Sequence, residues 1–283
     1  MRRPILAAES VTELGDEMRG AVLVAGSHGG LIASYFGAKA GAHALILNDA
    51  GVGLEAAGIA GLPWLDAIGL AAATVAHTSA RIGDGADSLA RGVISHANAG
   101  ALRAGVMAGM GARDAAALLV AAAAPFAAPP SYAEGRWRLN DDDDNGGRDG
   151  GANDETDRAR EIWALDSVGK LVAEDAGRIL LIGSHGALHG GRRDSALNLH
   201  GAPVAARAAV FNDAGVGADG AGITRLAELD VRRVPAATVS HASARIGDGR
   251  SMWASGVVSH VNRCAAARGA RAGMTAREFA ALF

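Results

Sequence analysis

The sequence contains one cysteine, few aromatic residues and almost no net charge, and each shortage excludes a class of protein. Because Cys264 is the only cysteine, an intramolecular disulfide and a cysteine-rich zinc site are both excluded. A formal net charge of −3 gives no basic surface of the kind that nucleic acid or an anionic membrane attracts. We therefore expect neither nucleic acid nor a membrane as a partner.

The sequence also has no long apolar run. Its longest uncharged stretch, residues 115–133, is interrupted by three prolines, and the first ten residues are basic without the apolar region of a secretory signal. We expect no membrane span and a location in the cytoplasm.

Small apolar residues and glycine are abundant instead. Hydrophobic residues make up 49% of the chain and aromatic residues only 4%, and there are 40 glycines. This composition is typical of a globular protein whose core is packed with Ala, Val and Leu. A length of 283 residues allows one large domain or two small ones.

Four sequence blocks occur twice, in the same order. The pairs are GSHGG at 26–30 with GSHGA at 183–187, NDAGVG at 48–53 and 212–217, HTSARIGDG at 77–85 with HASARIGDG at 241–249, and GVISHAN at 92–98 with GVVSHVN at 256–262. Such internal similarity predicts a tandem duplication. Because residues 125–157 are rich in Pro, Gly and acid, we expect an α/β repeat at 1–124, a solvated linker at 125–157 and a second repeat at 158–283.

Each half contains three apolar runs separated by helix-like segments. The runs are residues 21–26, 44–51 and 71–77 in the first half, and 178–183, 208–215 and 236–241 in the second. Continuous apolar runs that alternate with helices predict buried parallel strands. We expect each half to be a three-stranded βαβαβα (Rossmann-like) unit, closed by helices that begin at the GVISHAN or GVVSHVN block and near Ala112 or Thr275, with the halves related by a pseudo-two-fold axis.

The repeated polar residues directly follow the apolar runs. Open parallel sheets bind ligands outside the carboxyl ends of their strands, so the sequence predicts a site there. The candidate catalytic residues are Ser27, His28, Asp49 and His77, with Ser184, His185, Asp213 and His241 as their counterparts. The candidate substrate-binding residues are Gly29, Asn48, Ser79 and Arg81, with Gly186, Asn212, Ser243 and Arg245.

Each block also has a purely structural interpretation. The Ser-His loop resembles an anion-binding turn at a helix start, or is a tight turn with a structural histidine. In the functional interpretation, Asn48 and Asp49 orient a histidine, bind substrate or hold a metal. In the structural one, they form an Asx turn. Arg81 clamps a carboxylate or phosphate, or pairs with Asp84. Ser95 and His96, like Ser259 and His260, resemble the first turns of a helix, in which the histidine is a packed neighbour or a catalytic residue.

Several functions remain open at this stage. The order Ser27, Asp49, His77 is that of α/β hydrolases, which favours hydrolysis of a small anionic or amide-bearing metabolite. No cofactor is expected, although the same residues suit a divalent metal, and Asp49 lies where a dinucleotide-binding acid would. The alternatives are an isomerase or racemase with one site between the halves, and a non-enzymatic sensor. A homo-oligomer is left open.

Overall fold

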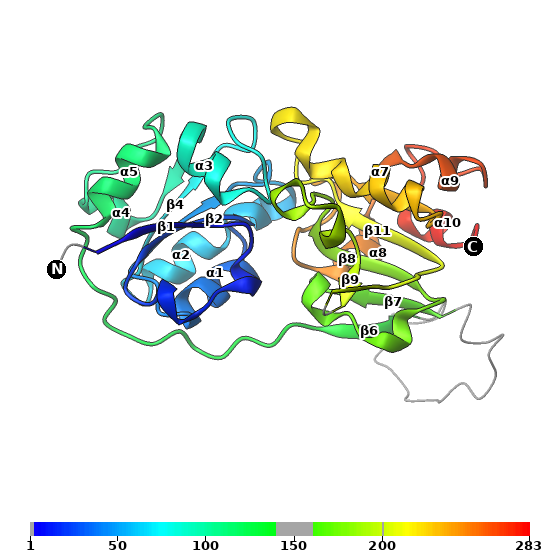
Figure 1. The fold of residues 1–283 in the computed structure, drawn as a ribbon, viewed down its shortest axis with the longest axis horizontal. Helices are drawn as coiled ribbons and strands as arrows, with labels where there is room; N and C mark the ends of the chain where they lie inside the picture. Colours follow the sequence, from blue (N-terminus) through cyan, green and yellow to red (C-terminus); the bar gives the residue numbers. More distant parts are fainter. Residues whose placement is uncertain (1–2, 140–160, 200) are drawn as a thin grey trace. The chain divides into compact units, whose positions relative to one another are not determined.

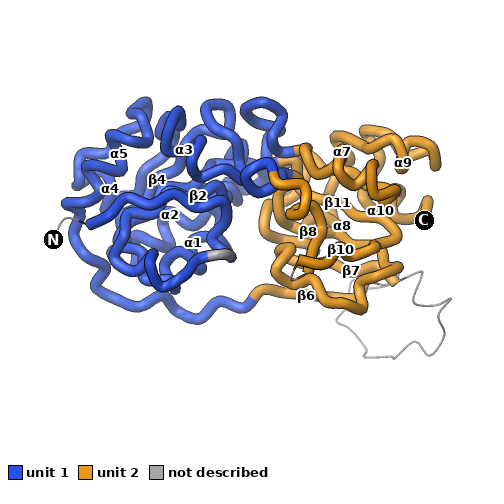
Figure 2. Tube along the Cα trace, viewed as in Figure 1, with its two compact units in different colours: residues 1–133, 187–191, 214–222 blue, residues 134–186, 192–213, 223–283 orange. Residues whose placement is uncertain are grey.

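A computed structural model describes residues 3–139, 161–199 and 201–283 of the chain. The described residues form two compact units (Figure 2). Unit 1 comprises Met1–Ala133, Ala187–Gly191 and Ala214–Gly222, and unit 2 comprises Glu134–Gly186, Arg192–Asp213 and Ile223–Phe283. Each unit contains one main sheet covered by helices, as Figure 1 shows.

Unit 1 is built on a five-stranded sheet in the order β1-β2-β3-β4-β5. Its strands are β1 (Ile5–Ala8), β2 (Val22–His28), β3 (Ala44–Asn48), β4 (Ala71–Val75) and β5 (Ile94–Ala97). The first four strands are parallel, and β5 runs antiparallel to β4. The residues of β2, β3 and β4 are entirely buried, as continuous apolar runs predict for central parallel strands.

Helices cover both faces of this sheet. The helices are α1 (Leu31–Lys39), α2 (Gly61–Asp66), α3 (Gly85–Arg91), α4 (Ala99–Arg103) and α5 (Ala112–Leu119), with short 3-10 segments η1 (Val11–Glu13), η2 (Asp16–Met18) and η3 (Leu54–Ile59). One apolar cluster joins α1 and α2 to one face of the sheet, and a second joins α4 and α5 to the other. The helices cover the two faces of the sheet and not the carboxyl ends of its strands, where the polar residues lie.

Unit 2 is built on a six-stranded sheet in the order β13-β12-β11-β8-β7-β6. Its strands are β6 (Arg136–Leu139), β7 (Ile162–Leu165), β8 (Ile179–His185), β11 (Ala208–Asn212), β12 (Ala236–Val239) and β13 (Val258–Val261). The edge strands β6 and β13 are antiparallel to their neighbours, and the inner pairs are parallel. A two-stranded ribbon of β9 (Asn198–Leu199) and β10 (Ala202–Pro203) accompanies it.

Helices also cover the sheet of unit 2. They are α7 (Thr224–Val231), α8 (Gly249–Ser255), α9 (Arg263–Ala266) and α10 (Ala276–Ala280), with the 3-10 segments η4 (Val168–Lys170), η5 (Ala173–Asp175) and η7 (Arg193–Ser195). Two further 3-10 segments, η6 (His189–Gly191) and η8 (Ala218–Ile223), fall wholly or mainly in the stretches that belong to unit 1.

The protein is thus a mixed α/β protein with two largely parallel sheets interleaved with helices. The expectation of three strands per half is wrong, because each sheet has additional strands on its edges. One extra strand in each sheet lies where a helix was expected: the GVISHAN block contains β5 and the GVVSHVN block contains β13. The helices expected near Ala112 and Thr275 are confirmed as α5 and α10.

Part of the expected linker is ordered as a strand. Arg136–Leu139 forms β6, which pairs with β7. The acidic run from Asp141 to Asp144 lies outside the described residues, and the expected domain boundaries stay a prediction. Among the described residues, no helix is long and apolar enough to cross a membrane.

Candidate functional site

The centre of the candidate site is a hydrogen-bonded pair, Asp49 and His77. Asp49 follows β3 and His77 follows the neighbouring strand β4, so the parallel sheet brings the two residues together. Oδ1 of Asp49 lies 3.0 Å from Nδ1 of the His77 ring. The same oxygen accepts hydrogen bonds from the backbone N–H groups of His77 at 2.9 Å and Gly51 at 3.0 Å.

These contacts keep Asp49 ionised. Its burial would raise the pKa of the carboxyl group, but hydrogen bonds from the ring and backbone N–H of His77, from the Gly51 N–H and from Ser95 outweigh burial and lower the pKa. A carboxylate can only accept, so Nδ1 of His77 carries the proton and Nε2 carries the basic lone pair. The His77 side chain is 25% exposed, so the ring extends from a buried anchor toward the surface.

Unit 2 contains the equivalent pair. Oδ1 of Asp213 lies 3.0 Å from Nδ1 of His241 and accepts the His241 backbone N–H at 2.8 Å. The Asp213 side chain is 5% exposed and that of His241 is 30% exposed. Both copies of the motif therefore fold to the same local geometry.

A left-handed turn directly follows Asp49. The four residues after Asp49 have φ values of 49° at Ala50, 75° at Gly51, 63° at Val52 and 71° at Gly53. A β-branched residue in this region is strained, by roughly 1–2 kcal/mol for an L-residue. The second copy has the same conformation at residues 214–217, including Val216 at 63°. Strain retained in both copies marks the turn as a candidate functional element.

The buried side chain of Asn48 stabilises this turn through hydrogen bonds. Its Oδ1 accepts the Ala50 N–H at 2.9 Å and its Nδ2 donates to the Ala80 carbonyl oxygen at 3.3 Å. Asn212 donates to the carbonyl oxygen of Ala244 at 3.0 Å. Both amides are fully buried, so the role that the structure shows for them is to hold loops in place.

The second copy of the turn packs against His77, and both belong to unit 1. Ala218 donates its backbone N–H to the His77 carbonyl oxygen at 2.7 Å. A methyl group added to Gly215 would lie 2.7 Å from Cδ2 and 3.0 Å from Nε2 of the His77 ring. A glycine is therefore needed there, both for this close approach and for its φ of 75°.

Ser95 and His96 join the pair from β5. Ser95 Oγ lies 3.1 Å from Thr74 Oγ1 and 3.1 Å from Nδ1 of His96. Ser95 is also one of the groups that lower the pKa of Asp49. The expected helix is wrong here, and with it the interpretation of His96 as a helix residue. Residues 93–96 read Val-Ile-Ser-His and do not alternate between apolar and polar, so the sequence here has no clear strand signal.

Ser27 and His28 lie at the end of β2, and both are buried. Ser27 Oγ accepts the Val11 N–H at 3.0 Å, and Ser184 Oγ accepts the Val168 N–H at 3.1 Å in the same way. Nδ1 of His28 accepts the Gly30 N–H at 3.1 Å, and desolvation lowers its pKa to about 4. His28 is therefore neutral at physiological pH. His185, its counterpart, is also buried.

The glycine N–H groups of the same loop are used within the backbone. Gly29 donates to the Asn48 carbonyl oxygen at 2.7 Å, and Gly186 donates to that of Asn212 at 2.8 Å. A methyl group on Gly29 would lie 2.6 Å from Cγ2 of Thr74. Close backbone packing thus accounts for these glycines.

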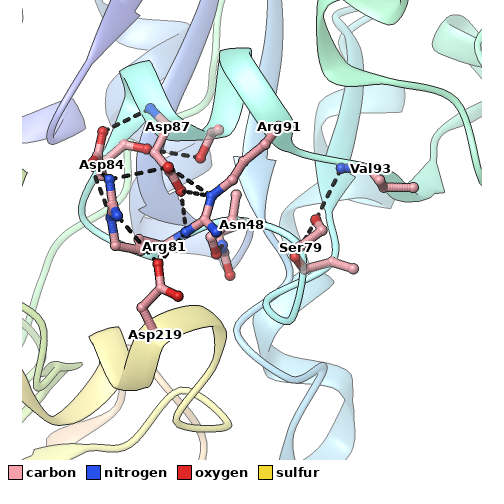
Figure 3. A network of polar contacts seen from close by, with 11 residues as sticks. Asn48, Ser79, Arg81, Asp84, Asp87, Arg91, Val93 and Asp219 are labelled. Carbon is pink, nitrogen blue, oxygen red and sulfur yellow. Dashed lines mark hydrogen bonds and ion pairs between the residues drawn. The ribbon is translucent and has the colours of Figure 1, made fainter.

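Arg81 lies in a network of aspartates (Figure 3). Its guanidinium contacts Asp84 at 3.0 Å, Asp87 at 3.1 Å and Asp219 at 3.2 Å. Arg91 contacts Asp87 and Asp219 as well. The pairing with Asp84 that the sequence left open is present, and Arg245 pairs with Asp248 at 2.8 Å in unit 2. Binding of an anion by either arginine stays a prediction.

Ser79 and Ser243 close their loops in the same manner. Ser79 Oγ donates to the Ala76 carbonyl oxygen at 2.7 Å and accepts the Val93 N–H at 2.9 Å (Figure 3). Ser243 Oγ donates to the Ser240 carbonyl oxygen at 2.8 Å and accepts the Val257 N–H at 2.9 Å. These hydroxyls fix the loops that carry the two histidines of the pairs.

The structure thus brings Asp49, His77, Ser95 and His96 together in unit 1, while the contacts of Ser27 lie elsewhere. In the part of the chain that the structure describes, no group of three or more His, Cys, Asp or Glu side chains is arranged to hold a metal ion. Comparison of the chain with models of known families, with curated proteins and with solved structures finds no match.

Proposed function

We propose that the protein is a hydrolase of a small anionic or amide-bearing metabolite, in which His77 is the general base. The observation that carries the proposal is the Asp49–His77 hydrogen bond at the carboxyl ends of two adjacent parallel strands. A buried carboxylate that holds one ring nitrogen of a partly exposed histidine is the arrangement that orients a catalytic imidazole.

The chemistry follows from the protonation state of the pair. Nε2 of His77 takes a proton from a water molecule while the oxygen of this water attacks the carbonyl carbon of the substrate. Asp49 stabilises the imidazolium that forms, because its carboxylate already accepts the Nδ1–H. When the tetrahedral intermediate collapses, the imidazolium returns the proton to the leaving group. General base catalysis of this kind contributes about 10²–10⁴-fold to a rate.

Water is a better candidate for the nucleophile than Ser27. The hydroxyl of Ser27 is buried and accepts the Val11 N–H, which holds the start of η1 against β2. An attacking serine instead donates its proton to the catalytic histidine. Ser95, whose hydroxyl is among the groups that hydrogen-bond Asp49, is our candidate for the residue that orients this water.

The matched geometry of the two pairs also supports a tandem duplication with two acid–base pairs. The bond between Asp213 and His241 has the same 3.0 Å length as that between Asp49 and His77. We propose that His241 has the same role in unit 2. The cytoplasmic location, the pseudo-two-fold axis and a homo-oligomer remain predictions.

The proposal is tested by screening the protein against a panel of small carboxylic esters and primary amides, with and without a further anionic group. His77→Gln and Asp49→Asn should lower kcat by at least about 100-fold, since they remove the base and its anchor. The exposed Asp114→Asn is the matched control and should retain full activity. The decrease of kcat in His241→Gln measures how much of the activity depends on the Asp213–His241 pair.

Two further experiments distinguish a water nucleophile from a serine nucleophile and from a metal-dependent mechanism. Ser27→Ala should retain turnover and lose only stability, by about 1–3 kcal/mol for an unpaired buried N–H. Dialysis against a chelator should leave activity unchanged. Loss of turnover in Ser27→Ala would indicate a serine nucleophile, and loss on chelation a metal. Saturable binding without product would identify a sensor, and full activity in the variants of both histidines would rule the proposal out.

A further inference from the structure

Two cationic side chains, Arg19 and Lys39, border two neighbouring hollows on unit 1. The larger hollow, of about 430 Å³, lies between residues 11–19 and the carboxyl-terminal part of α1. The smaller, of about 290 Å³, lies between the end of α1 and the segment 125–129. Both hollows are lined by Arg19 and Lys39, so one pair of cations serves both. Together they have the size of a small-molecule site.

Two cations, Arg19 and Lys39, line both hollows, Asp16 lines the larger one, and the Glu17 carboxylate lies against Gly15 in its wall. Arg19 forms an ion pair with the fully exposed Asp16 at 3.9 Å, a separation at which an exposed pair contributes little. Lys39 Nζ lies 5.7 Å from the centre of the Tyr35 ring. Among the residues that line the larger hollow, Arg19 and Lys39 therefore outnumber the single carboxylate.

The carboxyl end of α1 does not oppose an anion there. An exposed helix end carries partial negative charge on its last carbonyl groups. Here the carbonyl oxygens of Phe36, Gly37 and Ala38 accept the N–H groups of the next turn, at 3.0, 3.3 and 2.9 Å. Lys39 lies in this last turn and further compensates the dipole.

The smaller hollow has apolar walls. Ile68 and Leu70 are buried on one side, and Pro125, Ala128 and Pro129 form the other. This second wall is fixed, because the Phe126 N–H donates to the Ile68 carbonyl oxygen at 3.1 Å. The Phe126 ring also covers Gly69, where a methyl group would lie 2.4 Å from it. An apolar group placed here would be removed from water without any rearrangement of the wall.

We propose that this region binds a small anion with a short apolar body. The anionic group, a carboxylate or a phosphate, lies between Arg19 and Lys39. The apolar body occupies the hollow beside Ile68 and Leu70. This site is built from residues other than Asp49 and His77, so it does not depend on the proposed hydrolysis.

Calorimetric titration of the full chain with hexanoate and with hexyl phosphate tests the proposal. Acetate and inorganic phosphate supply the head group alone, and hexan-1-ol supplies the body alone. We expect one of the two amphipathic anions to bind at least tenfold more tightly than its head group or the alcohol. The preferred head group then identifies the site as one for carboxylates or for phosphates.

Variants locate the binding. The double variant Arg19→Gln, Lys39→Gln should weaken binding of the amphipathic anion at least tenfold, and Arg103→Gln, an exposed cation on α4, should not. Ala128→Phe fills the apolar hollow from an exposed position and should weaken it to a similar extent. Circular dichroism confirms that each variant is folded.

Three results would overturn the proposal. The first is no binding of either amphipathic anion at millimolar concentration. The second is acetate or phosphate binding as tightly as its amphipathic form, which would reduce the site to diffuse charge. The third is unchanged affinity in the Arg19, Lys39 double variant or in Ala128→Phe while the proteins remain folded.

Discussion

His28 shows how burial decides the protonation of a residue that sequence alone would place in acid–base chemistry. Its side chain is buried at the end of β2, and desolvation lowers its pKa from 6.5 to about 4. A histidine that is neutral at physiological pH and whose Nδ1 accepts the Gly30 N–H holds the loop together. It does so only while it is unprotonated, because the protonated ring has no acceptor.

The pH dependence of stability follows from this pKa. Between about pH 6.5 and 4 the unfolded chain binds a proton at His28 and the folded protein does not, so stability falls as the pH falls through this window. The loss attributable to His28 is about 3 kcal/mol. His28→Asn, whose Oδ1 can accept the Gly30 N–H, should show a smaller decrease in urea-unfolding free energy over the window than the wild type.

The decrease should be reduced and not abolished. His43 also has a lowered pKa, because of its burial and the nearby Arg3, and acts in the same direction. Equal slopes for the wild type and His28→Asn would show that His28 is protonated in the folded protein. NMR titration of the His28 ring carbons provides an independent check.

Which site residues could be predicted depends on what each one contacts. Asp49 and His77 could be predicted as neighbours, because the rule of converging strand ends concerns backbone topology, which apolar runs reveal. The role of Ser27 could not, because its partner is the N–H of Val11, in a short 3-10 segment with no clear signal in the sequence. Backbone partners of polar side chains become visible only in three dimensions.

At the scale of elements, neither the strand β5 nor the helix α3 was predicted from the sequence. The four residues of β5, Ile94–Ala97, do not alternate between apolar and polar, so a helix was expected where the structure has an edge strand. In the structure α3 begins after Asp84, its N-cap, which accepts the Asp87 N–H at 2.8 Å. The other oxygen of Asp84 accepts hydrogen bonds from Arg81.

Two substitutions at Asp84 separate these roles. Asp84→Ser keeps a capping oxygen and loses only the ion pair with Arg81, which is 43% exposed, so stability should fall by a few tenths of a kcal/mol. Asp84→Ala loses the cap too and should cost about 1 kcal/mol. The midpoint of urea unfolding measures both.

The second copy offers a matched control for this experiment. Asp248 caps α8 through the Ser251 N–H at 2.8 Å and pairs with Arg245, so Asp248→Ser and Asp248→Ala should repeat the difference. If the serine variants are as destabilised as the alanine variants, the ion pair and not the cap is the main contribution.

At the scale of the whole molecule, two short stretches of the second half belong to unit 1. Residues 187–191 and 214–222 contact unit 1 through backbone bonds such as Gly190 N–H to the Gly83 carbonyl oxygen at 2.7 Å and Ala218 N–H to that of His77. Repeated blocks predict two halves, but they contain no information about which half a loop packs against. That assignment depends on tertiary contacts between residues far apart in the sequence.

The connection between β6 and β7 provides a test at this scale. Leu139 pairs with Ile162 in an antiparallel ladder, so residues 140–161 need only close a hairpin, for which a few residues suffice. Deleting Asp141–Asn153, which lie outside the described residues, removes acid and glycine but few apolar side chains. Each halving of loop length changes the closure free energy by only about 0.6 kcal/mol. The melting temperature should therefore change by no more than roughly 2–4 °C.

A longer deletion, Arg136–Asn153, is the matched contrast because it also removes β6. Arg136 contacts the fully buried Asp175 at 2.6 Å, and its loss would leave that carboxylate without this partner. Asp175 keeps Arg178 at 3.5 Å, so losing Arg136 costs less than the ~3–5 kcal/mol of a fully unpaired buried charge, and the loss of the β6 ladder adds to it. The longer deletion should lower the melting temperature far more than the shorter one. If calorimetry finds equal losses, residues 141–153 contribute to the folded structure, and the prediction that they are a solvated connection is wrong.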